Sequence, residues 1–312
     1  MDAQDRAPAT VAIKEQLLAE QGGSFRPIVV SASELPTGSF DKLGLQRMNE
    51  PDKSAATYAI GDIHGRADLL KPLLAAIRGD AEKQGTAPRV IFLGDIIDHG
   101  PDSRLAMNLV CHTLDEWPAS RLILGNHDSF LLEFMTAEMI DVARFDNWVQ
   151  RQGGLATVLS YGLENFESHD TMTRYFRDTY RSHLDILTSA ERIIFDRRYA
   201  FVHAGVEPSL PLDQQRPRDL MWIREPFLQF DGPFSHVVVH GHTPNKEFTV
   251  EITSNRIGID TWAFRSGTLS CLAVSPDQDD LRIISARVDG ICTSGVSGPA
   301  ATIGSHQFVQ PG

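Results

Sequence analysis

The chain has 312 residues, of which 42% are hydrophobic and 22% are charged, as in an ordinary soluble globular protein. Its formal net charge of -12 argues against nonspecific binding to nucleic acids or anionic membranes, so neither partner is expected. Three widely spaced cysteines without a CxxC pair predict reduced thiols. The sequence shows no secretory signal and no run of roughly 20 apolar residues that could span a membrane, so we expect a soluble cytoplasmic protein.

The first part of the chain mixes a short helical pattern with turn-rich sequence, and we interpret residues 1–53 as an N-terminal extension. After it, three apolar runs of the strand type alternate with two segments in which apolar residues recur at helical spacing. In chain order they are Tyr58–Ile60, Arg66–Ile77, Arg89–Leu93, Ser103–Trp117 and Leu122–Leu124. This β-α-β-α-β order predicts a parallel sheet with crossover helices.

Beyond residue 128 the pattern changes from helices to strands. Helical spacing marks Ser129–Thr136, Met139–Leu159 and Thr171–Leu187. Strand patterns follow at Ile193–Phe195, Ala200–His203, His236–Val239, Arg256–Ile259, Leu269–Val274 and Leu281–Val288, the first two as a hairpin. Strands in both halves predict an α/β fold, a two-sheet β-sandwich flanked by helices, in one domain over residues 54–288. The small, Gly-rich sequence of residues 289–312 is interpreted as a flexible tail.

Five short motifs end apolar runs with side chains that can bind metals or phosphate. They are GDIHG (61–65), GDIIDHGPDS (94–103), GNHD (125–128), VHAG (202–205) and HGHTP (240–244). Together they contribute Asp62, His64, Asp95, Asn126, His203 and His242. Because functional groups collect at the carboxyl ends of strands in parallel α/β sheets, five strand ends can converge on one point.

These six side chains supply enough oxygen and imidazole ligands for two metal ions, with one carboxylate able to bridge. The donor set suits divalent transition metals, of which we expect Mn first, with Fe, Zn or Co as alternatives. Two such ions can clamp an in-line displacement at phosphorus and lower the pKa of a water to give a hydroxide nucleophile at neutral pH. The motifs therefore predict metal-assisted cleavage of a phosphate ester without a Ser or Cys nucleophile.

Three further residues complete the predicted machinery. His127 directly follows Asn126 and is the candidate general acid for the leaving oxygen. Asp98, three residues after Asp95, could hold the imidazole of His127 and set its tautomer. Arg224, in LMWIREPF, could bind two phosphoryl oxygens through its guanidinium.

As a set, the motifs resemble the PPP branch of the calcineurin-like metallophosphoesterases, from about Tyr58 to Val274. That branch includes protein Ser/Thr phosphatases, the small phage-lambda phosphatase and symmetrical diadenosine tetraphosphatases. The resemblance implies one metal on Asp62, His64 and His242, a second on Asn126 and His203, and Asp95 as the bridge. The WIRE segment is similar to the phosphate-binding Arg segment of bacterial and phage members, and we expect Arg224 and Asn126 beside the substrate phosphate.

Two positions depart from the pattern of that family. Its second motif usually reads GDxxDRG, with an Arg that contacts phosphate, whereas this chain has His99 there. We expect His99 to serve as a phosphate-binding residue, although an imidazole is cationic only near or below its pKa. Trp262, in GIDTWAF, stands where a glycine is common and predicts a bulkier surface near the site. His240 has two interpretations: a metal ligand, as in the wider superfamily where both histidines of a GHxH pattern can bind, or a core or supporting residue, which is favoured because only the second histidine of HGHTP matches a ligand of the PPP pattern.

The expected function is that of a phosphoprotein phosphatase acting on Ser or Thr, with Tyr also considered. The alternative substrate is a nucleotide polyphosphate such as diadenosine tetraphosphate, cleaved symmetrically. A non-enzymatic alternative is a binding module on a degenerate phosphatase scaffold, and the complete set of metal ligands, His127, Asp98 and Arg224 argues against it. The sequence does not predict the oligomeric state.

Overall fold

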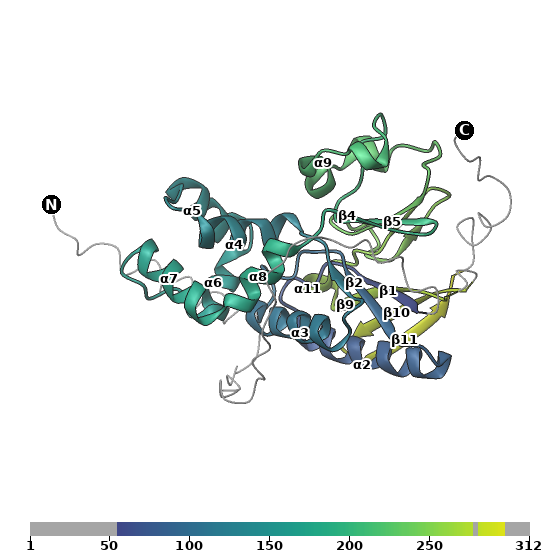
Figure 1. The fold of residues 1–312 in the computed structure, drawn as a ribbon, viewed down its shortest axis with the longest axis horizontal. Helices are drawn as coiled ribbons and strands as arrows, with labels where there is room; N and C mark the ends of the chain where they lie inside the picture. The colour runs from purple at the N-terminus through teal and green to yellow at the C-terminus, as the bar shows by residue number, and fades with distance from the viewer. Residues whose placement is uncertain (1–54, 277–279, 297–312) are drawn as a thin grey trace. The chain divides into compact units, whose positions relative to one another are not determined.

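The computed structural model describes residues 55–276 and 280–296, so the predicted extension 1–53 lies outside the described residues. Two mixed sheets organise the described part (Figure 1). The first sheet has the strand order β11-β10-β9-β1-β2-β3, and the second has the order β4-β5-β6-β8-β7. The first comprises β1 (Ala56–Ile60), β2 (Pro88–Phe92), β3 (Arg121–Leu122), β9 (Thr268–Val274), β10 (Leu281–Arg287) and β11 (Gly290–Gly295). The second comprises β4 (Ile193–Asp196), β5 (Tyr199–Val202), β6 (Val237–His240), β7 (Glu251–Ile252) and β8 (Arg256–Gly258).

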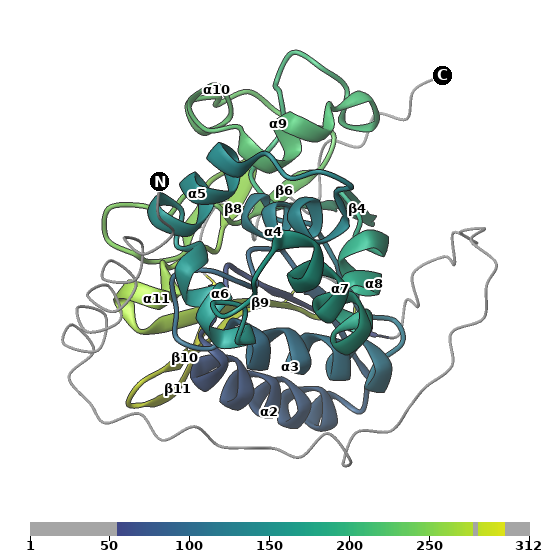
Figure 2. The ribbon, with the colours of Figure 1, turned by 90° about the vertical axis from the view of Figure 1, so that its left-hand side faces the viewer.

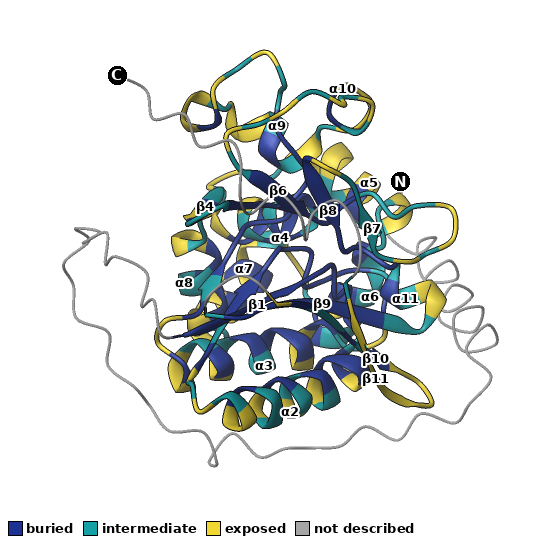
Figure 3. Cartoon of the chain, turned by 90° about the vertical axis from the view of Figure 1, so that its right-hand side faces the viewer, coloured by how far each residue is buried: buried dark blue, intermediate teal, exposed yellow. Residues whose placement is uncertain are grey.

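The predicted β-α-β-α-β unit forms the parallel part of the first sheet. β1 pairs in parallel with β2, and β2 pairs in parallel with β3. The crossover helices are α2 (Ala67–Gln84) and α3 (Ser103–Glu116), which run side by side along one face of the sheet (Figure 3). The second sheet contains the predicted hairpin of β4 and β5, followed by parallel pairing of β5 with β6 and of β6 with β8.

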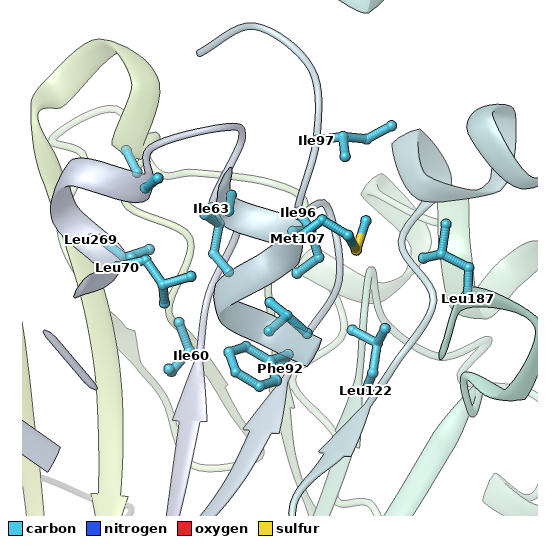
Figure 4. Close-up of a cluster of buried hydrophobic side chains, with 14 of the residues drawn as sticks. Ile60, Ile63, Leu70, Phe92, Ile96, Ile97, Met107, Leu122, Leu187 and Leu269 are labelled. Carbon is cyan, nitrogen blue, oxygen red and sulfur yellow. The ribbon is translucent and has the colours of Figure 1, made fainter. Parts of the chain in front are cut away.

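The central strands are mostly apolar because both of their faces are largely buried. In β1, Ile60 packs among residues of the helical layer, whereas Ala59 packs in the cluster between the two sheets. Figure 4 shows Ile60 and Phe92 from neighbouring strands beneath Leu70 of α2 and Met107 of α3. β5 repeats this alternation, with Phe201 in the cluster between the sheets and its neighbours on the opposite face.

The middle of the chain forms five helices, which lie together on the side of the protein that faces the viewer in Figure 2. They are α4 (Asn126–Thr136), α5 (Val142–Arg151), α6 (Gly154–Tyr161), α7 (His169–Thr179) and α8 (Arg181–Ser189). The structure divides the continuous helix predicted at Met139–Leu159 into α5 and α6. The break falls at Gly153, whose φ of +82° leaves the helical region and is readily adopted only by glycine.

Several short elements were not predicted from sequence. They are a 3-10 turn at Leu212–Gln214, α9 (Pro217–Trp222), α10 (Glu225–Leu228), α11 (Ala263–Ser266), β7 and β11. β11 corrects the predicted start of the tail, because Gly290–Gly295 pairs antiparallel with β10. Its residues are all exposed, so it lacks the apolar alternation that identifies a strand in sequence. No helix in residues 55–276 or 280–296 has the length and apolar character needed to cross a bilayer.

Candidate active site

Six buried side chains from the predicted motifs lie at the ends of strands from both sheets. Asp62 and His64 follow β1, Asp95 follows β2, and Asn126 begins α4 just beyond β3. From the second sheet, His203 follows β5 and His242 follows β6. None of the six is more than 7% exposed. The predicted convergence of strand ends therefore occurs, and it excludes most solvent from the point where the ends meet.

The ligand atoms of these residues form two groups that share one carboxylate. Asp62, His64 and Asp95 have ligand atoms within 4.8 Å of one another, and so do Asp95, His203 and His242. The side-chain oxygen Oδ1 of Asn126 lies 2.8 Å from Nε2 of His203. His242 thus groups with His203, whereas the family resemblance implied that it accompanies Asp62 and His64.

The tautomers of two histidines leave the right atoms free for cations. Nδ1 of His64 lies 2.8 Å from the carbonyl oxygen of Ile97, and Nδ1 of His203 lies 2.8 Å from that of Leu93. A carbonyl oxygen can only accept, so each Nδ1 carries the proton. Nε2 of His64 then keeps its lone pair, and Nε2 of His203 faces Oδ1 of Asn126 at 2.8 Å, a pair of electron-pair donors that a shared cation would suit. Nε2 of His242 is buried and has no hydrogen-bond partner among the described residues.

The charges of the site also fit bound cations. Burial, with the nearby carboxylates of Asp260 and Asp95, raises the pKa of Asp62 well above its usual range. Burial also raises the pKa of Asp95 and lowers those of His203 and His242, which keeps both imidazoles neutral. Neutral imidazoles are metal ligands, and divalent cations offset the repulsion between buried carboxylates. The residues present therefore fit a binuclear metal site.

The backbone of the site is held in uncommon conformations. His64, Asp95, Asp98, His99 and His242 all have φ between +46° and +73°, a left-handed region that non-glycine residues seldom adopt. Each such residue costs on the order of 1 to 3 kcal/mol, and strain of this kind clusters at functional sites. The surrounding fold compensates for that cost.

Two motif glycines allow the backbone to approach the carboxylates closely. A Cβ atom on Gly125 would lie 2.1 Å from Oδ1 of Asp95, and one on Gly241 would lie 2.0 Å from Oδ1 of Asp62. Neither position can accept a side chain without displacing a candidate ligand. The glycines of GNHD and HGHTP are therefore required by the packing of the site itself.

His127 and Asp98 form the pair predicted from sequence. Nδ1 of His127 lies 2.7 Å from Oδ2 of Asp98, and the side chain of Asp98 is fully buried. Burial disfavours the charged imidazole, but the carboxylates of Asp95 and Asp98 prevail and raise the pKa of His127 to about 9. The ring is therefore protonated at neutral pH, as a general acid must be.

Two residues that hold Asp98 were missed as site residues. Nε1 of Trp148 donates to Oδ2 of Asp98 at 2.7 Å, and Oγ1 of Thr157 donates to Oδ1 at 2.7 Å. Trp148 reads in sequence as a packing residue of a helix, and it is indeed wholly buried. Because its hydrogen bond joins residues 50 positions apart, no local pattern could have revealed it.

A cavity of about 650 Å³ opens beside the six candidate ligands. Arg224 lines it together with His64, Asp95, His127 and His242. The guanidinium of Arg224 makes no hydrogen bond or ion pair with any residue that the structure describes, so it is available to an anion.

His99 lines the same cavity but does not have the charge that a family Arg would provide. Burial and the neighbouring His127 lower the pKa of His99 to about 4, so its ring is neutral at pH 7. The ring stacks on Phe264 with 4.4 Å between centroids. His240 lies outside both ligand groups; it is buried, and its ring contacts that of Phe227 at 5.0 Å. His240 thus occupies a core position, one of the two readings of its sequence.

Two buried carboxylates near the site were also missed. Asp128 accepts from the backbone N–H of Ile96 through Oδ1 and from that of Gly125 through Oδ2, which ties two ligand-bearing loops together. Asp260 accepts from the backbone N–H of Trp262 at 2.8 Å. Asp128 is the last residue of GNHD, so its motif was the only signal that could have identified it.

Comparison with known proteins supports the reaction class indicated by this geometry. The family model for calcineurin-like phosphoesterases matches residues 56–267. A symmetrical bis(5'-nucleosyl)-tetraphosphatase of Serratia proteamaculans is 32% identical over 111 residues, covering 31% of this chain and 37% of that protein. A protein of the same name from Nitrosospira multiformis is 26% identical over 160 residues, covering 51% of this chain and 46% of that protein. The chain therefore spans less than half the length of these curated relatives.

A solved structure supports the fold. A cold-active protein tyrosine phosphatase is 16% identical, with coverage of 80% of this chain and 82% of that one and a TM-score of 0.51. At this identity the likeness concerns the fold alone. The prediction of an α/β fold with two sheets flanked by helices is confirmed.

Proposed function

The chain belongs to the calcineurin-like phosphoesterase family, and from this premise we propose that it hydrolyses dinucleotide polyphosphates, with diadenosine tetraphosphate as the reference substrate. Its reaction class is that of a metal-dependent phosphoesterase. The observation that carries the choice of substrate is local similarity, at 26 to 40% identity, to proteins named symmetrical bis(5'-nucleosyl)-tetraphosphatases. The phosphoprotein substrate, which was the first expectation from the sequence, becomes the competing hypothesis.

In this proposal the six strand-end side chains hold two divalent cations. Asp62 and His64 would hold one ion, Asn126, His203 and His242 would hold the other, and Asp95 would contribute to both. When bound, such ions supply positive charge for the phosphoryl oxygens and acidify water near neutral pH. The protonated Nδ1 atoms of His64 and His203 orient the two imidazoles through the carbonyl oxygens that they contact.

The other side chains bind the substrate and move a proton. Arg224 presents an unpaired guanidinium to the cavity, and two of its N–H groups can bind two phosphoryl oxygens at once. Oδ2 of Asp98 accepts a hydrogen bond from Nδ1–H of His127, so the proton on Nε2 is the one that can be transferred. We assign that proton to the oxygen of the leaving nucleoside diphosphate.

The test is a substrate panel with analysis of the products. Protein reconstituted with Mn or with Zn is incubated with diadenosine tetraphosphate, a phosphoserine peptide and a phosphotyrosine peptide. We expect the dinucleotide to have the highest kcat/KM and ADP to be its only nucleotide product, because cleavage of the central anhydride leaves two equal halves.

Each other outcome points to a different function. A higher kcat/KM for either peptide would support the phosphoprotein hypothesis. Release of AMP and ATP would contradict symmetrical cleavage. Loss of all three activities, with metal bound, would revive the interpretation as a binding module.

A further inference from the structure

The cavity beside the candidate ligands has an aromatic side as well as a polar one. Phe248, Trp262 and Phe264 line it, and we call these three residues the aromatic wall. All three come from the segment between β6 and β9, whereas the candidate metal ligands come from five different strand ends. The side chains of the wall are partly exposed, so the cavity reaches them from solvent.

The rings of the wall form a chain of contacts that begins at His64. Phe264 contacts His64, with 5.2 Å between ring centroids. Trp262 contacts Phe264 at 5.7 Å, and Phe248 contacts Trp262 at 4.8 Å. Within residues 55–276, the ring contacts of Trp262 are with Phe264 and Phe248, and not with the histidines of the site. Trp262 therefore lies one ring contact beyond Phe264, which touches His64, and Phe248 lies two contacts beyond Phe264.

Both outer residues are held in strained, well-anchored conformations. Phe248 has φ of +55° and Trp262 has φ of +54°, values that bulky residues rarely adopt. The side chain of Asn245 ties the loop that carries Phe248, through hydrogen bonds with the backbone N–H and the carbonyl oxygen of Thr249. The guanidinium of Arg265 lies 4.9 Å from the centroid of the Trp262 ring and supports it.

Such strain is maintained at ligand sites when the conformation aims a side chain at a bound molecule. A glycine would adopt the same φ without cost, and it would remove the ring. Phe248 and Trp262 are only partly buried, so packing of their rings explains poorly why both keep a strained positive φ. We infer that the aromatic rings themselves are needed at this side of the cavity.

We propose that Trp262 and Phe248 stack against a nucleobase of the substrate, a proposal that rests on the proposed function. Aromatic side chains stack on any base, because every base has a π face. A base in a nucleoside polyphosphate is separated from the reacting phosphorus by a ribose and a further phosphate. An aryl ring esterified directly to the reacting phosphate would instead lie beside His99 and Phe264. Because Trp262 and Phe248 lie beyond Phe264 in the chain of ring contacts, we expect them to bind a nucleobase and not the ring of phosphotyrosine.

The test is equilibrium binding to the metal-reconstituted protein, measured by titration calorimetry. The ligands are ADP, inorganic diphosphate, phenyl phosphate and inorganic phosphate, and the ratio of the Kd values for diphosphate and ADP measures recognition of the nucleoside. The variant Trp262→Gly removes the ring at a position where glycine fits the backbone. Trp262→Phe keeps a ring, and Phe195→Ala is the control, since Phe195 is an exposed aromatic residue of β4 outside the cavity lining.

We expect wild-type protein to bind ADP roughly 10-fold more tightly than diphosphate, in line with the affinity that one stacked base adds. Trp262→Gly should bring the ratio close to 1 and leave the Kd of diphosphate unchanged. Trp262→Phe should retain part of the ratio, and Phe195→Ala all of it. If Trp262→Gly does not fold, Phe248→Gly should lower the ratio in the same direction.

An unchanged ratio in the folded glycine variant would overturn the proposal. So would a loss for phenyl phosphate relative to inorganic phosphate with the ADP ratio intact, because the wall would then bind a phosphorylated aromatic ring. The proposed function fails separately: a protein that discriminates ADP from diphosphate through Trp262 but does not hydrolyse diadenosine tetraphosphate keeps the nucleobase site and loses that substrate.

Discussion

The reaction centre and the aromatic wall share one cavity but are built in different ways. The candidate ligands are buried, follow strands of both sheets and are linked through the shared carboxylate of Asp95. The aromatic wall is partly exposed, belongs to one segment and is held by ring contacts and a short tied loop. In our proposals, the two sheets position the side chains that act on phosphorus. The segment between β6 and β9 recognises the group to which the phosphate is attached.

The largest expected effect comes from the shared carboxylate. Asp95→Asn keeps the shape of the side chain and removes its charge, so it should weaken both metals and lower kcat/KM by roughly 10³-fold or more, since metal ions supply several kcal/mol of charge stabilisation. The measurement is kcat/KM on diadenosine tetraphosphate at saturating Mn. A kcat/KM within 10-fold of wild type would contradict the proposal that Asp95 contributes to both metal sites.

The control for Asp95→Asn is another buried aspartate. Asp196 of β4 is 1% exposed and pairs at 2.8 Å with Arg89 of β2, in the other sheet, and neither residue lines the cavity. Asp196→Asn should lower the free energy of unfolding, because it leaves the charge of Arg89 without its partner. The turnover of the folded fraction should remain that of wild type.

The next largest effect should depend on the leaving group. His127→Asn removes the candidate acid, and general acid catalysis typically contributes about 10² to 10⁴-fold. We expect a loss in this range for a phosphoserine peptide, whose alkoxide needs a proton, and a smaller loss for p-nitrophenyl phosphate. Steady-state kcat on the two substrates makes the comparison, and equal losses would assign His127 to metal binding or to structure.

A smaller effect should follow from loosening Asp98. Trp148→Phe keeps a buried ring and removes the donor to Oδ2, so Asp98 should hold His127 less firmly. Partners that orient a functional residue typically contribute about 10 to 100-fold, and we expect the lower end because Thr157 still donates to Asp98. The control is Trp117→Phe, at a largely buried tryptophan at the end of α3. Equal kcat values for the two variants would show that Trp148 only packs.

The smallest effect should come from His99, which lies between the two regions and contacts His64 and Phe264. Its pKa of about 4 makes it neutral at pH 7, in contrast to the Arg of the family pattern. His99→Asn, which tolerates the left-handed backbone, should change the Ki of inorganic phosphate by less than about threefold at pH 7. A weakening of more than about 10-fold would restore His99 as a phosphate-binding residue.

The convergence of the candidate metal ligands could be predicted from sequence because its signal is local. An apolar run that ends in Gly-Asp or Gly-Asn shows both the strand and the side chain at its end, as at Asp62, Asp95 and Asn126. The grouping of His242 with His203 could not be read in this way, because it depends on how the second sheet packs on the first. The same holds for Trp148, whose partner is distant in sequence.

The aromatic wall was only partly visible in the sequence. Trp262 stands out in the sequence because it replaces a common glycine, whereas Phe248 lies in a segment without any motif. The break between α5 and α6 at Gly153 was hidden by apolar spacing that continues across it. A Cβ atom there would lie 2.5 Å from the ring of His99, so a tertiary contact requires the glycine in addition to its φ of +82°.

The metal content of the purified protein tests the central claim most directly. After removal of bound metal and reconstitution with Mn, elemental analysis of wild-type protein should give close to two metal ions per chain, and Asp95→Asn should bind clearly fewer. One ion or none per chain in fully active wild-type protein would contradict a binuclear centre formed where the two sheets meet.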